Sequence, residues 1–137
     1  MSRIPTDSEV VRGHSQGPIL LIDDNADVRE ALTQLLRTSG YKVIAARDGA
    51  KALQLLHEGL EPRAILLDLM MPKMDGFEFR RRQLADIKLK SIPTIVYSGY
   101  PDVAKASREL GEMVHFCKSG RLRSLLDVVE QYCRRAV

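Results

Sequence analysis

The chain has 137 residues, 45% of them hydrophobic and 28% charged, which is ordinary composition for one globular domain with a sizeable core. A net charge of +3 is too small to imply a nucleic-acid partner by itself, and with no tryptophan and 5% aromatic residues a base-stacking platform is not expected. No stretch approaches the roughly 20 apolar residues of a membrane helix, and no signal peptide is apparent. With only two widely spaced cysteines, Cys117 and Cys133, we expect a cytoplasmic protein with buried thiols.

The first part of the chain predicts a tail, a strand and a helix. Residues 1–16 mix polar, proline and glycine residues without periodicity, so we expect a flexible tail followed by a single domain over 17–137. The apolar run 18–22 predicts a strand that ends at Asp23 and Asp24. Asn25 is a suitable N-cap for a helix that Gly40 would end.

Four further strands and helices are expected in alternation. The strands are predicted at 41–45, at 64–67 just before Asp68, at 93–97 just before Ser98, and at 112–117 just before Lys118. The helices are predicted at 50–56, from 76 through 84, at 102–110 and at 121–135. Five strands alternating with five helices predict an α/β fold, a (βα)5 doubly wound five-stranded parallel sheet.

Polar residues follow four of the predicted strands at their carboxyl ends. These residues are Asp23 and Asp24, Asp68, Ser98 and Lys118. The carboxyl ends of parallel strands share one edge of the sheet, where ligands bind, so the side chains are expected to converge. Three carboxylates repel one another without a cation, and hard oxygen ligands favour Mg²⁺. A metal, a carboxylate nucleophile and a cationic group together predict phosphoryl transfer onto Asp68.

These residues also carry a family resemblance. From about Gly17 to Arg135 the chain resembles the receiver domain of two-component response regulators, a flavodoxin-like fold, through Leu21-Ile22-Asp23-Asp24, Leu67-Asp68-Leu69-Met70-Met71-Pro72, Met74-Asp75-Gly76, Ser98 and Lys118. The resemblance implies that Asp68 is the phosphoacceptor and that Asp23, Asp24 and the backbone carbonyl of Met70 bind Mg²⁺ with it. It also implies that Ser98 and Lys118 contact the bound phosphoryl group.

The resemblance further implies a stand-alone, chemotaxis-regulator-like signalling protein. Its phosphodonor would be a histidine kinase or a histidine phosphotransfer protein. Its output would be docking to a downstream target protein or relay of the phosphoryl group to a histidine phosphotransfer partner. It would catalyse its own phosphorylation and dephosphorylation and would not be an enzyme in the ordinary sense. We expect a monomer or a phosphorylation-dependent dimer. The chain ends just after the last predicted helix, so no DNA-binding domain is expected, and the Arg80-Arg81-Arg82 run is read as a solvated helix face.

Two positions depart from the family pattern. The lysine is usually followed by proline, whereas Ser119 follows Lys118; a cis bond there would cost about 2.5–4 kcal/mol without proline. The switch position, usually Tyr or Phe, is His115. His115 is therefore either the switch residue, acting with Ser98, or a partly buried histidine without that role.

Two alternatives stay open. One is a degenerate receiver that acts as a phosphorylation-independent binding module, which Ser119 and His115 would suit. The other is a haloacid-dehalogenase-like phosphatase, which would need a second aspartate two residues after the nucleophile, where Met70 stands. Nucleotide-binding loops of the GxGxxG or GxxxxGK[ST] type are not found in the sequence.

Overall fold

A computed structural model describes residues 17–68, 76–98, 114–117 and 122–135. The predicted tail at 1–16, the predicted helix at 102–110, and Met70, Lys118 and Ser119 lie outside these residues. For Ser98 and His115 only the backbone is described. No helix in the described part of the chain is both long and apolar enough to cross a membrane.

The described strands form one parallel sheet in the order β2-β1-β3-β4-β5. The strands are β1 (Ile19–Ile22), β2 (Val43–Ala46), β3 (Ala64–Leu67), β4 (Thr94–Ser98) and β5 (Val114–Cys117). The helices are α2 (Ala26–Thr38), α3 (Gly49–His57), α4 (Gly76–Ala85) and α6 (Leu122–Arg135). This order is that of the flavodoxin-like doubly wound sheet, and it confirms the predicted fold.

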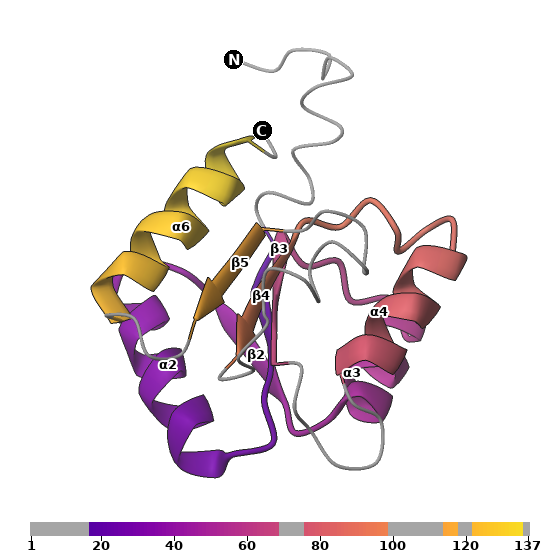
Figure 1. The fold of residues 1–137 in the computed structure, drawn as a ribbon, viewed down its shortest axis with the longest axis horizontal. Helices are drawn as coiled ribbons and strands as arrows, with labels where there is room; N and C mark the ends of the chain where they lie inside the picture. The colour runs from indigo at the N-terminus through magenta and orange to yellow at the C-terminus, as the bar shows by residue number, and fades with distance from the viewer. Residues whose placement is uncertain (1–16, 69–75, 99–113, 118–121, 136–137) are drawn as a thin grey trace, which may run out of the picture.

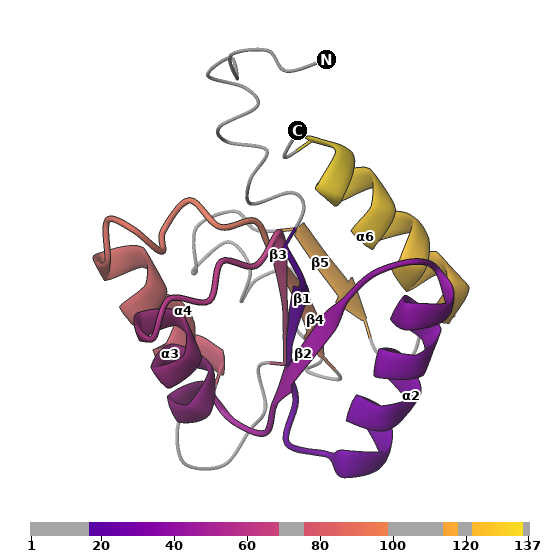
Figure 2. The ribbon, with the colours of Figure 1, turned by 180° about the vertical axis from the view of Figure 1, so that it is seen from behind.

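Helices cover both faces of the sheet (Figures 1 and 2), with α2 and α6 on one face and α3 and α4 on the other. Alternate residues of each strand point to opposite faces and build two separate cores. Leu20, Ile22 and Leu67 pack with Phe79 of α4 and the buried leucines of α3. Leu21 and Leu66 pack with the buried side chains of α2 and α6 on the opposite face. The continuous apolar strands are therefore buried on both sides, which explains why they do not alternate in sequence.

Capping residues fix the ends of α2 and α3. Asn25 accepts a hydrogen bond from the N–H of Val28 at 3.0 Å, which confirms the predicted N-cap of α2. Gly40 has a φ of +97°, and the N–H of Tyr41 donates to the carbonyl of Leu36, so α2 ends in a Schellman turn. Because the N–H of Tyr41 bonds to the helix, it is not used in the sheet, and β2 begins at Val43 instead of the predicted residue 41.

The prediction that Arg80 lies on a solvated helix face is wrong. Arg80 is only 6% exposed, whereas its neighbours Arg81 and Arg82 are exposed and pair with Glu78. The Arg80 Nη1 atom donates to Gln83 Oε1 at 2.7 Å and to Thr94 Oγ1 at 3.2 Å. A buried guanidinium is costly unless it keeps hydrogen-bond partners, and these bonds supply them. They also join α4 to Thr94, the first residue of β4.

Candidate functional site

The backbone of the sheet brings Asp23 and Asp68 side by side. Ile22, the last residue of β1, is paired with Leu67, the last residue of β3. Asp23 and Asp68 directly follow these two residues. The N–H of Asp68 donates to the carbonyl of Ile22 at 2.9 Å, so the pairing continues into the site. Both aspartates are therefore held by the sheet itself and not by a loop.

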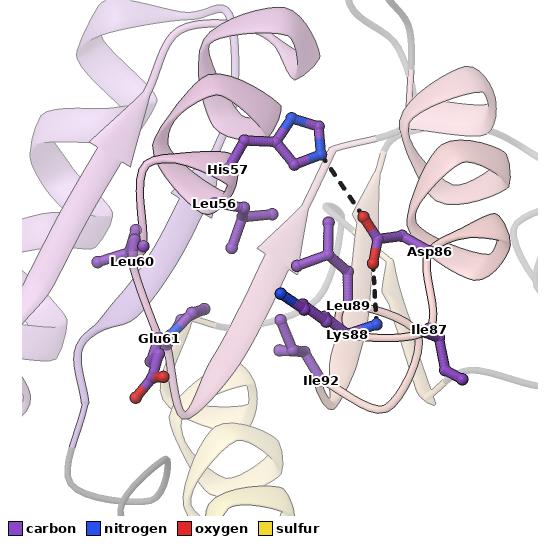
Figure 3. Close-up of a pocket in the computed structure, with 11 residues that line it drawn as sticks. Leu56, His57, Leu60, Glu61, Asp86, Ile87, Lys88, Leu89 and Ile92 are labelled. Carbon is purple, nitrogen blue, oxygen red and sulfur yellow. Dashed lines mark hydrogen bonds and ion pairs between the residues drawn. The ribbon is translucent and has the colours of Figure 1, made fainter.

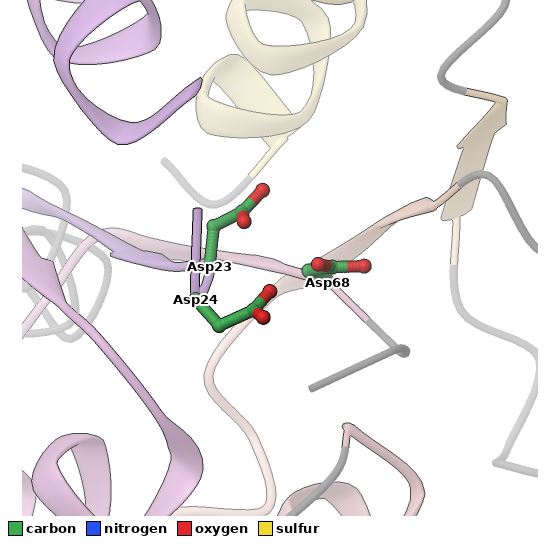
Figure 4. A group of neighbouring side chains, drawn as sticks. All are labelled: Asp23, Asp24 and Asp68. Atoms are coloured by element: carbon green, nitrogen blue, oxygen red, sulfur yellow. The ribbon is translucent and has the colours of Figure 1, made fainter. Parts of the chain in front are cut away.

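Asp23, Asp24 and Asp68 form an acidic cluster at this edge (Figure 4). One carboxylate oxygen from each residue lies within 4.8 Å of the other two. Asp23 and Asp68 are buried, while Asp24 is exposed, so the cluster reaches solvent on the side of Asp24. The structure thus confirms the predicted convergence of these three carboxylates.

The start of α2 orients Asp23. Its Oδ1 atom accepts the backbone N–H of Asn25 at 2.9 Å, and Asn25 in turn caps the helix. The Arg29 guanidinium, one turn into the helix, donates from Nη1 to the Asp23 carbonyl oxygen at 2.8 Å. The positive end of the helix dipole also lies beside the cluster and favours negative charge there.

The donor set fits a hard divalent cation. Each of the three residues offers a carboxylate oxygen, two of them from buried positions where isolated charge is costly. Mg²⁺ binds one or two protein carboxylates and keeps several waters or phosphate oxygens as its other ligands. Asp24 is exposed, so one carboxylate of the set faces solvent.

The remaining predicted site residues are placed only by backbone or not at all. Ser98 is the last residue of β4, at the same sheet edge as Asp68, and its backbone pairs with Cys117 of β5. Lys118 follows Cys117 in the chain but lies outside the described residues, as does Met70. His115 lies in β5 opposite Val96, and its side chain is not among those described.

Sequence reasoning missed one contributor, Arg29. Its contact with the Asp23 carbonyl spans six positions, from the strand end to the second turn of the helix. A basic residue near a helix N-terminus is unfavourable because it opposes the helix dipole. The position of Arg29 near the start of α2 was therefore the one sign in the sequence that its side chain has a specific contact.

A family model described as "Response regulator receiver domain" matches residues 19–130. The chain is 32% identical over 115 residues to "Sporulation initiation phosphotransferase F" of Bacillus subtilis, covering 83% of this chain and 91% of that protein. It is 35% identical over 121 residues to "Response regulator MprA" of Mycobacterium sp. strain KMS, covering 85% of this chain but only 50% of that protein.

Solved structures agree with the sequence comparison. A putative response regulator from Chloroflexus aurantiacus superimposes with a TM-score of 0.79 and 28% identity, covering 86% of this chain and 98% of that one. Both kinds of comparison point to the same family and include the strands that carry the acidic cluster.

Proposed function

Since the chain belongs to the response regulator receiver domain family, we propose that it accepts a phosphoryl group on Asp68 in two-component signalling. The observation that carries the proposal is the cluster of Asp23, Asp24 and Asp68 at the carboxyl ends of β1 and β3. A strand-end aspartate beside two further carboxylates is the arrangement expected for a cation-dependent phosphoacceptor.

In the proposed reaction, a carboxylate oxygen of Asp68 attacks the phosphorus of a phosphohistidine. An O–P bond forms, the N–P bond of the donor breaks, and the imidazole nitrogen of the donor takes the bonding electron pair. Asp23, Asp24, Asp68 and the Met70 carbonyl would hold Mg²⁺, which when bound neutralises charge on the phosphoryl oxygens. The family resemblance assigns the hydroxyl of Ser98 and the ammonium of Lys118 to those same oxygens. Hydrolysis of the aspartyl phosphate by water would return Asp68 to its starting state.

The proposed donor is a histidine kinase or a histidine phosphotransfer protein, and the proposed output is docking to a target protein in the cytoplasm. One relative is named as a phosphotransferase, so relaying the phosphoryl group onward is the form of output that this likeness favours. We propose that the domain catalyses its own phosphorylation and dephosphorylation and does not act as an enzyme on other substrates.

The proposal is tested by intact-mass spectrometry after incubation with acetyl phosphate and Mg²⁺. The wild-type chain should gain one phosphoryl adduct, chelation with EDTA should prevent it, and Asp68→Asn should abolish it. Asp27→Asn is the matched control, because Asp27 is an exposed aspartate in the first turn of α2 that is not part of the cluster.

An adduct that persists in Asp68→Asn would overturn the assignment of Asp68. If the folded wild-type chain gains no adduct from acetyl phosphate or from a purified kinase, it is the degenerate binding module instead.

A further inference from the structure

A hollow of about 660 Å³ lies at the edge of the sheet opposite the acidic cluster (Figure 3). Its residues precede β3 and β4, at the amino ends of the strands, whereas Asp68 follows β3. The buried leucines and isoleucine Leu56, Leu89 and Ile92 form its apolar lining. We call this feature the amino-edge groove.

One wall of the groove is the end of α3. Gly59 has a φ of +110°, and the N–H of Leu60 donates to the carbonyl of Leu55 at 3.1 Å, which closes a Schellman turn. Leu60 is thereby held against the core, and Pro62 follows it on the same wall. This wall is a hydrogen-bonded turn with a defined shape.

The other wall is the turn after α4. Asp86 Oδ1 accepts the N–H of Lys88 at 2.8 Å, and the Asp86 carbonyl accepts the N–H of Leu89 at 3.0 Å. The buried amide of Gln83 donates to the carbonyls of Leu89 and Ile92. Across the groove, His57 Nε2 lies 3.6 Å from Asp86 Oδ2, an ion pair whenever the imidazole is protonated. Both walls are therefore fixed before anything binds.

Ile87 projects from this rigid turn. It is 79% exposed, and it points away from the hollow that it borders (Figure 3). A turn of this kind normally places a small or polar residue at its tip, so the fold itself gives no reason for a large β-branched side chain. A single exposed apolar side chain is common on protein surfaces, but Ile87 stands beside an apolar hollow, and the two together form a surface suited to contact with another molecule.

We propose that a second copy of this chain occupies the amino-edge groove, with Ile87 of each copy inserted into the hollow of the other. A two-fold interface joins the same patch on both copies, so it requires a patch that carries both the knob and the hollow. The amino-edge groove carries both. The charges of the patch are also complementary to themselves. Glu61 borders the groove on the α3 side and Lys88 on the α4 side, so a two-fold axis between them places Glu61 of each copy opposite Lys88 of the other.

This dimer is separate from the proposed phosphorylation. The groove and Asp68 lie at opposite edges of the sheet, so the dimer leaves the acidic cluster open to a phosphodonor. Asp68→Asn should therefore dimerise as the wild type does. A failure of the dimer would leave the phosphoacceptor proposal untouched, and the reverse also holds.

Sedimentation velocity from micromolar to millimolar chain concentration tests the dimer. The wild type should show reversible, concentration-dependent association. Ile87→Asp should raise the dimer dissociation constant by roughly 100- to 10,000-fold, because each two-fold dimer loses two buried isoleucines, one from each copy. Leu84→Asp is the matched control, because Leu84 is also an exposed apolar residue, at 38%, but does not line the groove. It should associate as the wild type does, and thermal melts should show that both variants fold.

The charge arrangement gives a second test. Glu61→Lys and Lys88→Glu should each weaken association, and the double variant should recover most of it, because the swap restores opposite charges across the axis. A wild-type chain that stays monomeric throughout the concentration range overturns the proposal. So does a dimer that Ile87→Asp leaves unchanged.

Discussion

The backbone N–H of Asn25 donates a hydrogen bond of 2.9 Å to Oδ1 of Asp23, which gives Asp23 a structural part as well as a place in the acidic cluster. Asp24, its neighbour, is exposed, and within the described part of the chain its only part is in the acidic cluster. Two adjacent aspartates that look equivalent in sequence should therefore respond differently to substitution.

Asp23→Ala should destabilise the fold, and Asp24→Ala should not. The first removes a buried hydrogen-bond acceptor at the start of α2, at an expected cost of about 1–3 kcal/mol. The second relieves repulsion among three carboxylates, so the melting temperature in EDTA should stay level or rise. Both should weaken Mg²⁺ binding, measured by titration calorimetry. A clear fall in the melting temperature of Asp24→Ala in EDTA would show that Asp24 is a structural cap instead.

Arg80→Met should cost about 1–3 kcal/mol of folding free energy, because Gln83 and Thr94 would each lose a buried partner. Arg81→Met is the neighbouring control and should change stability by about 0.5 kcal/mol or less, since Arg81 is exposed. Urea unfolding of the two variants measures the difference. Equal stability losses would mean that the buried bonds of Arg80 contribute no more than a surface ion pair.

The Cys133 thiol should be protected in the folded chain. Burial raises the pKa of Cys133 above its usual 9.0, and the nearby Arg63 guanidinium offsets part of the rise. In a Cys117→Ser background, iodoacetamide at pH 8 should label the native protein far more slowly than the urea-unfolded protein, because the thiolate is the reactive form.

The same pKa shift predicts a loss of stability at high pH. Above pH 9 the thiol of the unfolded chain ionises while the native thiol stays neutral, so stability falls as pH rises towards the raised native pKa. Cys133→Ala should show a smaller fall over this range in urea unfolding. Rapid native labelling, or identical pH profiles for the two proteins, would contradict this account of Cys133.

If His115 is the switch residue, activation should depend on pH. A histidine ring gains charge near pH 6.5, and a charged ring resists burial. At saturating beryllofluoride, which stands in for the phosphoryl group, the NMR shift changes around β5 and α6 should therefore weaken below about pH 6.5. His115→Tyr should remove the pH dependence. Equal responses of both proteins at every pH would make His115 a bystander.

The fold was predictable because its signals are local. Apolar runs marked β1, β3 and β4, and the capping residues Asn25 and Gly40 marked the ends of α2. The convergence of Asp23, Asp24 and Asp68 followed from the geometry of a parallel sheet, which needs no knowledge of side-chain contacts.

The burial of Arg80 and the amino-edge groove, which sequence analysis did not predict, depend on partners distant in sequence. Arg80 looked solvated beside two other arginines, yet it shares a buried helix face with Phe79 and Gln83, and its partner Thr94 is 14 positions away. The amino-edge groove depends on how two turns lie beside each other, from Pro62 on one wall to Asp86 on the other at least 24 positions apart along the chain, which no local pattern encodes. Short-range periodicity could not have found either.

The pairing of strands and helices in the two cores also bears on how the chain folds during synthesis. Leu125 and Val129 of α6, near the end of the described chain, pack in one core with Ile19 and Leu21 of β1, near its beginning. That face of the sheet is therefore covered by α2 alone until α6 has left the ribosome. During that interval the part of this face that α6 later buries lies in water, which exposes the nascent chain to aggregation.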